Sequence, residues 1–445
     1  MAGGRSNAPE LAEVVSRFGR QLMEQHALSA RQVKALHNIL QCRTAQIGGH
    51  EQVCEQCGEV SYSYNSCGDR HCPKCQITKQ AVWIDDLVAA TLPVKHYHII
   101  FTVPHQLNDI CLYDAKTYYQ VLFSAVWRTL HSFGYSHFGA ETGAVAILHS
   151  WGQNLSLHPH VHCIVPAAGY TIDGRWKQIG KFKNFLYPVH QLSDAFKGKF
   201  LDSIRRKLKK TGKADGFNEQ LQSAENARWV VYCEASMARA EHVMRYLGQY
   251  THRIAISNHR IVSVTDTHVT FKAKDYRDGA QHKLVTMEGV EFLRHFCLHV
   301  MPQGFVRIRR YGIYNHTTQR NLDLQFFTQA QTAAKEIEKK KERPQERIKR
   351  LTGVDVCRCP SCKSGRLIVI KELPRIRSPA GHLPQYCSLS YNRSSGTPSR
   401  PSILMKDGVV LPYFTVFIPK SRNPMVIFLL QPKCLSSCAK NVHLF

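Results

Sequence analysis

The chain has 445 residues, of which 43% are hydrophobic, and this composition excludes a wholly disordered protein. Its 59 Lys and Arg against 33 Asp and Glu leave a net charge of +26, which favours a polyanionic partner. No apolar stretch is long enough to cross a membrane, and the N-terminus lacks an apolar signal core. We therefore expect a cytoplasmic protein in a reducing compartment, where its 16 cysteines are better read as metal ligands and buried thiols than as disulfides.

Helices and strands alternate along the chain in a pattern that predicts an α/β or α+β central domain. Residues 10–45 carry apolar side chains at helical spacing, with Ser29 as a plausible N-cap. A cysteine-rich, turn-rich segment follows at 42–80. The further predicted elements are a strand at 94–104, a helix at 115–134, two strands within 144–166, a basic helix at 195–210, a strand at 228–234, a helix at 237–250, short strands at 254–256 and 269–273, a helix at 287–298, a charged helix or linker at 330–350 and two strands within 403–430.

Two Cys-x2-Cys pairs stand in the cysteine-rich segment, Cys54 with Cys57 and Cys72 with Cys75, with 14 residues between them. Each short loop presents two sulfurs from one turn, which suits a tetrahedral Zn²⁺. Four protein ligands close the site, so we expect a structural zinc. Nearby residues that could replace one ligand are Cys42, His50, Cys67 and His71.

A second cysteine group lies at Cys357, Cys359 and Cys362. It offers one Cys-x2-Cys turn, or knuckle, without an obvious second knuckle to complete a zinc site. Cys387 is a possible fourth ligand, and Cys434 and Cys438 lie further along the chain. A second zinc site is one interpretation of this group, and buried or surface thiols are the other.

Three histidines alternate in the sequence LHPHVHCIVP, at His158, His160 and His162. On a strand, residues two apart share one face, so two or three imidazoles would meet there. Imidazole suits divalent ions such as zinc and manganese, and so few ligands would leave room for a phosphate oxygen. The alternative is a row of surface histidines on an edge strand.

Two tyrosines, Tyr246 and Tyr250, are four residues apart in RYLGQYTHR and would share one helix face. An aromatic pair packed in a core is the ordinary interpretation of this spacing. Arg245, His252 and Arg253 favour a second one, in which a tyrosine hydroxyl attacks a phosphate that a metal has polarised.

These three features, in this order, resemble the rolling-circle insertion-sequence transposases of the two-tyrosine HUH class, the insertion sequence 91 group. The matching segments cover roughly residues 10–320. They are CRTAQIGGH, the CEQC…SYNSCGDRHCPKCQ segment, HYHIIFTVPH, WGQNLSLHPHVHCIVPAAG, YLGQYTHRIAISNHRI and PQGFVRIRRYG. The resemblance does not extend beyond about residue 371.

The resemblance implies a function for the paired histidines and tyrosines. The histidine motif falls on His160 and His162, which would hold a catalytic Mg²⁺ or Mn²⁺, and the nucleophiles fall on Tyr246 and Tyr250. The third metal ligand stays open among His158, Gln153, Gln249 and His252. The fold implied is α+β, a ferredoxin-like HUH nuclease core preceded by a helical and zinc-binding N-terminal region.

The domain organisation expected on this basis has five parts. They are a helical region at 1–45, a zinc-binding domain at 46–90, an HUH transposase catalytic domain at 91–325, a basic charged helix with a cysteine-containing segment at 326–371, and an atypical, partly disordered tail at 372–445.

The activity implied is cleavage and rejoining of single-stranded DNA at the ends of an insertion sequence, through a 5′-phosphotyrosine, by a bacterial enzyme acting at the nucleoid. Target DNA is the second expected partner, and no membrane is involved. The DNA-binding residues expected from the basic excess are Arg205, Arg206, Lys207, Arg307, Arg309 and Arg310. Three alternatives remain: a plasmid replication initiator or relaxase, a non-catalytic zinc-bearing DNA-binding protein, and a metal-dependent hydrolase.

Overall fold

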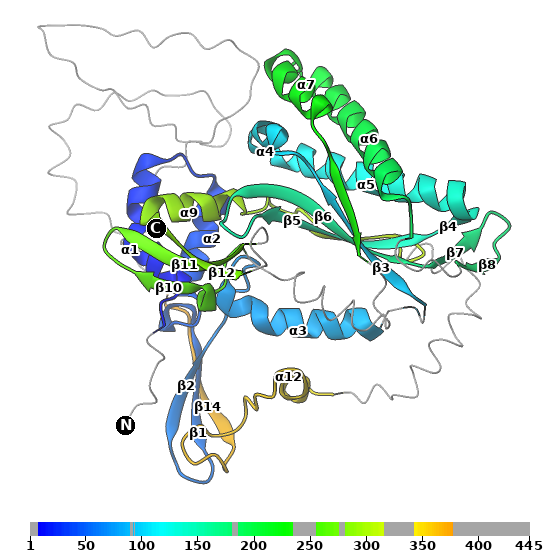
Figure 1. Cartoon of the computed structure of the whole chain (residues 1–445). Coiled ribbons are helices and arrows are strands. Elements are labelled where there is room, and N and C mark those ends of the chain that lie inside the picture. Colours follow the sequence, from blue (N-terminus) through cyan, green and yellow to red (C-terminus); the bar gives the residue numbers. More distant parts are fainter. Residues whose placement is uncertain are drawn as a thin grey trace, which may run out of the picture. The chain divides into compact units, whose positions relative to one another are not determined.

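A five-stranded antiparallel sheet with the strand order β13-β5-β6-β3-β9 forms the centre of the fold (Figure 1). The computed structural model describes residues 8–89, 92, 94–179, 186–234, 255–275, 281–315 and 342–376. The five strands are β3 (His96–Thr102), β5 (Gly143–Trp151), β6 (Leu157–Pro166), β9 (Val230–Glu234) and β13 (Ile308–Gly312). The α+β class expected from the sequence is confirmed.

Two long helices, α5 (Ala115–Phe138) and α6 (Val189–Lys210), cover one face of this sheet (Figure 1). Phe101 of β3 packs edge-on against Phe196 of α6, with ring centroids 5.1 Å apart. Strand side chains alternate between the two faces. Phe101 and Val161 therefore point toward the helices, while His98, His160 and His162 point to the opposite face.

A second core forms where two N-terminal helices pack on a smaller sheet. The helices are α1 (Leu11–Gln25) and α2 (Ala30–Gln41), and they are joined by α9 (Gly289–Leu298) and by the sheet of β10 (Ile261–Val264), β11 (His268–Asp275) and β12 (Gln281–Glu288). Ser29 accepts a hydrogen bond from the Gln32 backbone and completes a capping box, which confirms the predicted N-cap. A Cβ on Gly289 of α9 would lie 2.3 Å from the Phe18 ring of α1, so only glycine lets α9 and α1 approach this closely.

A third, small sheet brings together two distant parts of the chain. Its order is β14-β1-β2, with β1 (Gly49–Cys54), β2 (Val60–Tyr64) and β14 (Leu367–Leu373). Strands β1 and β2 form a hairpin, and helix α3 (Pro73–Ala89) follows this hairpin. Helix α12 (Pro344–Thr352) docks on α3. Arg347 of α12 forms ion pairs of 2.8 Å with Asp85 and 2.6 Å with Asp86 of α3.

The remaining elements are short or peripheral. They are α4 (Asn108–Tyr113), α7 (Asn218–Asn226), the 3-10 turns η1 (Ala45–Ile47), η2 (His105–Leu107), η3 (Asp215–Phe217) and η4 (Asn258–Arg260), and the sheet of β4 (Ala140–Glu141), β7 (Ala168–Thr171) and β8 (Trp176–Gln178). No helix in the described residues is long and apolar enough to span a membrane.

Most predicted elements are present, and two predictions are wrong. Residues 255–256 form no strand, and the strand there begins only at Ile261. Met287 belongs to β12, so the helix predicted from it begins at Gly289. The helix expected at 237–250 and the strands expected within 403–430 lie outside the described residues.

Candidate active site and metal-binding clusters

Three histidines on two neighbouring strands meet on the sheet face opposite α5 and α6. They are His149 of β5 and His160 and His162 of β6, and one ring nitrogen from each lies within 4.8 Å of the others. His149 lies directly opposite His160 in the strand register. This histidine cluster offers three imidazole ligands from a rigid sheet, which suits a divalent metal ion that keeps open coordination positions.

The hydrogen bonds around the cluster orient its rings. Nδ1 of His160 lies 2.7 Å from the backbone oxygen of His158, and a carbonyl can only accept, so Nδ1 carries the hydrogen and Nε2 carries the lone pair. Burial lowers the pKa of His160 to about 4, which keeps the ring neutral at pH 7. Nδ1 of His162 lies 2.8 Å from Nε2 of His98, on the neighbouring strand β3. Both ligand rings are thus held in place by a second group.

The sequence did not identify His149, although it supplies the third ring. His158 is exposed, and its side chain is not part of the histidine cluster. Gln153 accepts a hydrogen bond from Arg260 through its backbone oxygen. His149 stands in a continuous buried run, GAVAILHS, in which a single histidine carries no signal of its own. Only the pairing of β5 with β6 places it opposite His160.

Several residues of the expected active site lie outside the described part of the chain. Tyr246 and Tyr250 fall within residues 235–254, as do Gln249 and His252. Their roles as nucleophiles and as further metal ligands stay predictions.

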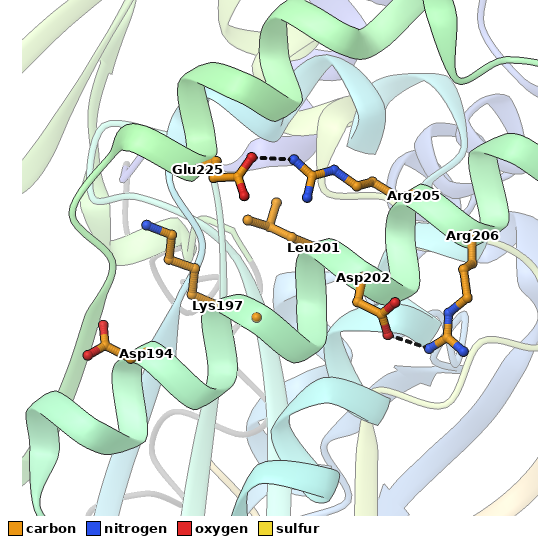
Figure 2. A pocket seen from close by; sticks show the side chains of 8 residues that line it. Asp194, Lys197, Leu201, Asp202, Arg205, Arg206 and Glu225 are labelled. Atoms are coloured by element: carbon orange, nitrogen blue, oxygen red, sulfur yellow. Dashed lines mark hydrogen bonds and ion pairs between the residues drawn. The ribbon is translucent and has the colours of Figure 1, made fainter.

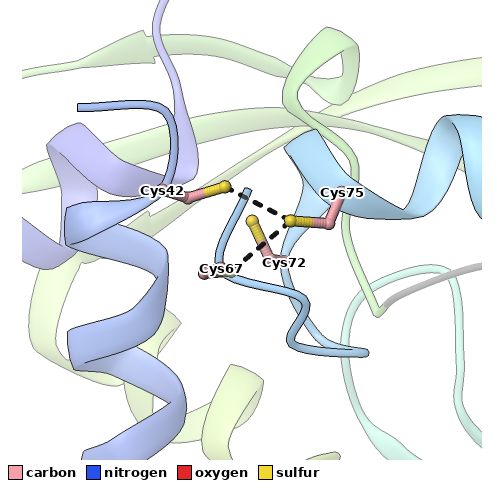
Figure 3. A group of neighbouring side chains, drawn as sticks. All are labelled: Cys42, Cys67, Cys72 and Cys75. Atoms are coloured by element: carbon pink, nitrogen blue, oxygen red, sulfur yellow. Dashed lines mark hydrogen bonds between the residues drawn. The ribbon is translucent and has the colours of Figure 1, made fainter. Parts of the chain in front are cut away.

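The expected zinc site made of Cys54, Cys57, Cys72 and Cys75 is wrong in its grouping. The structure divides these four residues between two cysteine clusters. The first cysteine cluster consists of Cys42, Cys67, Cys72 and Cys75 (Figure 3). The second cysteine cluster consists of Cys54, Cys57, Cys359 and Cys362. The reason is the hairpin: Cys54 and Cys57 lie at its tip, while Cys72 and Cys75 lie beyond its base.

The first cysteine cluster lies where the end of α2 meets the start of α3. Cys42 is the C-cap of α2, and Cys75 stands in the first turn of α3. The Sγ atom of Cys75 lies 3.3 Å from that of Cys42 and 3.4 Å from that of Cys67 (Figure 3). All four sulfurs of the cluster lie within 4.8 Å of one another, and they form a closed set of ligands for a structural zinc.

A buried carboxylate, Asp69, lies in the loop between Cys67 and Cys72 of the first cysteine cluster. Asp69 accepts hydrogen bonds from Arg31 at 2.9 Å and Asn38 at 3.0 Å, and its Oδ1 lies 2.9 Å from Nδ1 of His71. Burial alone would raise the pKa of Asp69, but the bonds from His71 and Arg31 outweigh it and hold the pKa well below its usual range. His71, considered above as a zinc ligand, instead accepts from the Met301 backbone through Nε2. It is not part of the cluster.

The basic residues expected to bind DNA lie on both sides of the central sheet. Arg205 pairs with Glu225 at 2.5 Å and Arg206 with Asp202 at 2.5 Å, in an open pocket on the outer side of α6 (Figure 2). The third residue of this group, Lys207, is exposed. Because the inner side of α6 packs on the sheet, this group lies on the far side of the helices from the histidine cluster.

The other three arginines lie on or beside β13. The Arg309 guanidinium stacks over Phe123 of α5 at 4.1 Å, and that of Arg307 lies 5.8 Å from the Trp151 ring. Arg310 lies opposite Val145, which in turn lies opposite Ile164. Ile164 shares its face with His162, so Arg310 is on the same sheet face as the histidine cluster.

Comparison with known proteins gives two matching family models. One is described as "Transposase zinc-binding domain" and matches residues 14–103, and the other is described as "Putative transposase" and matches residues 143–321. The first range holds the first cysteine cluster, and the second holds the histidine cluster.

Two relatives are similar to the chain over long stretches. "Putative transposase y4qJ" of Sinorhizobium fredii is 37% identical over 391 residues, which is 84% of this chain and 98% of that protein. The "Transposase for insertion sequence element IS801" of Pseudomonas savastanoi pv. phaseolicola is 24% identical over 301 residues, 65% of this chain and 72% of that protein. No solved structure matches the chain significantly. The two matched regions and the nearly full-length relative show that the chain belongs to the IS91 family of transposases, enzymes that act on DNA.

Proposed function

We propose that this transposase cleaves and rejoins single-stranded DNA at the ends of its insertion sequence through a 5′-phosphotyrosine intermediate, in rolling-circle-type transposition. The observation that supports the proposal is the histidine cluster, because it brings together on one face of the sheet three imidazole side chains of a kind that binds divalent metal ions. Tyr246 and Tyr250 supply the nucleophiles in this proposal.

The donor set of the histidine cluster fits a divalent cation. His149, His160 and His162 would hold it through neutral ring nitrogens, and imidazole ligands favour Mn²⁺ over Mg²⁺, which prefers oxygen. The bound ion supplies Lewis-acid polarisation of the scissile phosphate. The low pKa of His160 keeps this ligand unprotonated through the neutral range.

The covalent step belongs to the tyrosines. The hydroxyl oxygen of Tyr246 or Tyr250 attacks the phosphorus, the new O–P bond links the 5′ side of the DNA to the protein, and the P–O3′ bond breaks. The tyrosine hydroxyl gives up its proton as it attacks, and the departing 3′ oxygen takes up a proton and becomes a free hydroxyl, so the step is balanced. Because the phosphotyrosine ester conserves the bond energy, a 3′-hydroxyl can later attack it and rejoin the strands without ATP. Two tyrosines would allow donor and target cleavages to alternate.

Basic side chains would hold the DNA backbone during these steps. Arg310 is one of them, because it shares the sheet face of the histidine cluster. Arg205, Arg206 and Lys207 on α6 would contact phosphates farther from the reacting centre.

The decisive experiment is to trap the covalent intermediate. The full-length protein is incubated with Mn²⁺ and a single-stranded oligonucleotide that carries one end of its element, and the adduct is mapped by mass spectrometry. We expect DNA attached to Tyr246 or Tyr250, reduced adduct in each single Phe variant and none in the double variant. Tyr62→Phe, an exposed tyrosine on β2, is the matched control. Cleavage without any protein–DNA adduct would indicate a metal-dependent hydrolase and refute the proposal.

A further inference from the structure

We propose that the second cysteine cluster binds a zinc ion of its own, so that each chain holds two structural zinc ions. This second zinc would join the tip of the β1–β2 hairpin to residues 357–373, far along the chain. The matched zinc-binding domain ends at residue 103, so two of the four ligands, Cys359 and Cys362, lie outside it. The inference does not depend on the proposed function.

Two sulfur–sulfur separations in the second cysteine cluster match those of a tetrahedral zinc site. The Sγ atoms of Cys54 and Cys362 are 3.7 Å apart, and those of Cys57 and Cys359 are 3.8 Å apart. Four sulfurs at about 2.3 Å from a central zinc lie about 3.8 Å from one another, by the geometry of a tetrahedron. Both distances run between the two knuckles, so each knuckle contributes half of one ligand shell.

The two knuckles have the same backbone geometry. In the first, Gly58 N–H donates to the Cys54 oxygen at 3.0 Å, and in the second, Lys363 N–H donates to the Cys359 oxygen at 3.0 Å. The residue after each second cysteine is left-handed, with φ of 68° at Gly58 and 59° at Lys363. A left-handed lysine is strained. Lys363 stands at the position equivalent to Gly58, and we infer that zinc bound to Cys359 and Cys362 holds this turn in its strained conformation.

Gly365 fits closely against the sulfurs. A Cβ at this position would lie 2.4 Å from Sγ of Cys54 and 3.4 Å from Sγ of Cys362. Its N–H donates to Sγ of Cys362 at 3.2 Å, a bond that stabilises a thiolate. A side chain at position 365 would collide with the Cys54 sulfur, so this position needs glycine.

The segment from 342 to 376 has almost no hydrophobic core of its own. Its apolar side chains Val354, Val356 and Ile368 are 59%, 45% and 48% exposed, and Cys359 is the buried hydrophobic residue of the segment. A small unit without a core needs a metal or a disulfide to stay folded. Zinc at the second cysteine cluster would supply that energy and hold β14 against β1.

The test counts zinc in the full-length protein. Native mass spectrometry and elemental analysis of the wild type should give two zinc ions per chain, and Cys359→Ser with Cys362→Ser should give one. Cys357→Ser is the matched control, because Cys357 lies two residues away yet outside the cluster; this variant should keep two. Amide exchange at β14 should become faster in the double variant and stay unchanged in the control.

The wild type alone can also decide the question, so a variant that fails to fold does not leave the proposal untested. In the zinc-loaded wild type, Cys359 and Cys362 should resist alkylation until a chelator is added. A wild type with one zinc, or disulfides joining Cys54 to Cys362 and Cys57 to Cys359, would overturn the proposal. So would a double variant that retains two zinc ions.

Discussion

Nε2 of His98 lies 2.8 Å from Nδ1 of His162, and the two rings stack with centroids 5.1 Å apart and planes 11° from parallel. His98 stands on β3 and is not one of the three clustered histidines. Its position is that of an outer partner, which fixes the orientation of a ligand ring and raises its basicity. His98 is therefore a positioning residue in the proposed site.

Replacing His98 with Phe should weaken metal binding and leave the fold intact. Phe keeps a stacked ring but removes the nitrogen that meets His162. Loss of such an outer partner typically costs about 10- to 100-fold in metal affinity. Titration with Mn²⁺ followed by electron paramagnetic resonance measures the change. His158→Ala is the control, because the backbone oxygen that His160 uses remains. Equal Mn²⁺ affinity in His98→Phe and the wild type would exclude the positioning role.

His149→Ala should abolish strand cleavage as fully as His160→Ala or His162→Ala. Removing a direct ligand should cost more than removing an outer partner, so we expect Mn²⁺ affinity to fall by at least about 100-fold. Affinity for single-stranded DNA should stay nearly unchanged, since Lys and Arg contacts to phosphate dominate binding. Cleavage assays and filter binding on the same preparations separate the two effects. Full cleavage by His149→Ala would remove this residue from the metal site.

Arg310→Ala should weaken binding of single-stranded DNA more than Arg206→Ala. Arg310 lies on the sheet face of the histidine cluster, whereas Arg206 lies on the outer side of α6. Loss of one phosphate contact should reduce the slope of log affinity against log salt by about 0.7 for a single strand. Fluorescence anisotropy from 50 to 200 mM salt would measure it. A larger effect of Arg206→Ala would place the DNA path over α6.

The local elements could be predicted because their signals are local. The Ser29 cap, the helical spacing of 10–45 and the alternating His160 and His162 depend on neighbours within a few residues. The metal clusters were predicted less well because they depend on long-range pairing. His149 meets His160 through strand register, and Cys54 meets Cys362 across 308 positions in the chain.

Spacing alone also misled the prediction of the first zinc site. Two Cys-x2-Cys pairs separated by 14 residues fit one zinc, yet the first pair lies at the tip of the β1–β2 hairpin and the second pair follows its base. Each Cys-x2-Cys pair therefore lies beside two other cysteines. Cys42 and Cys67 complete one cluster, and the CRCPSC knuckle completes the other.

The protein should lose stability as the pH falls from about 6.5 to about 4, in part because of His299. This ring is 3% exposed, and its Nε2 donates to the Leu155 oxygen at 2.9 Å. Burial lowers the pKa of His299 to about 4. Between the two pKa values the unfolded chain binds a proton that the folded chain does not, so the free energy of unfolding decreases toward acid, by up to about 3 kcal/mol for this group.

Denaturant unfolding at pH 7.5 and pH 5 measures this dependence. His299→Gln removes the titrating group, so the difference in stability between the two pH values should become smaller, whatever the variant does to stability at pH 7.5. His268→Gln, an exposed histidine on β11, is the control and should keep the wild-type difference. A His299→Gln protein with the same pH dependence as the wild type would show that the buried ring does not titrate in this range.

Gly365→Ala should release the zinc ion of the second cysteine cluster although none of its four ligands is replaced. The added methyl would lie 2.4 Å from Sγ of Cys54 and 2.8 Å from Cβ of Gln56, and neither can withdraw, because both belong to the first knuckle. The zinc count should fall from two to one, and β14 should lose protection from amide exchange. Gly216→Ala is the control, since a Cβ there meets nothing within 4 Å. Two zinc ions retained in Gly365→Ala, with unchanged exchange at β14, would mean that the sulfurs do not share a closed ligand shell at this place.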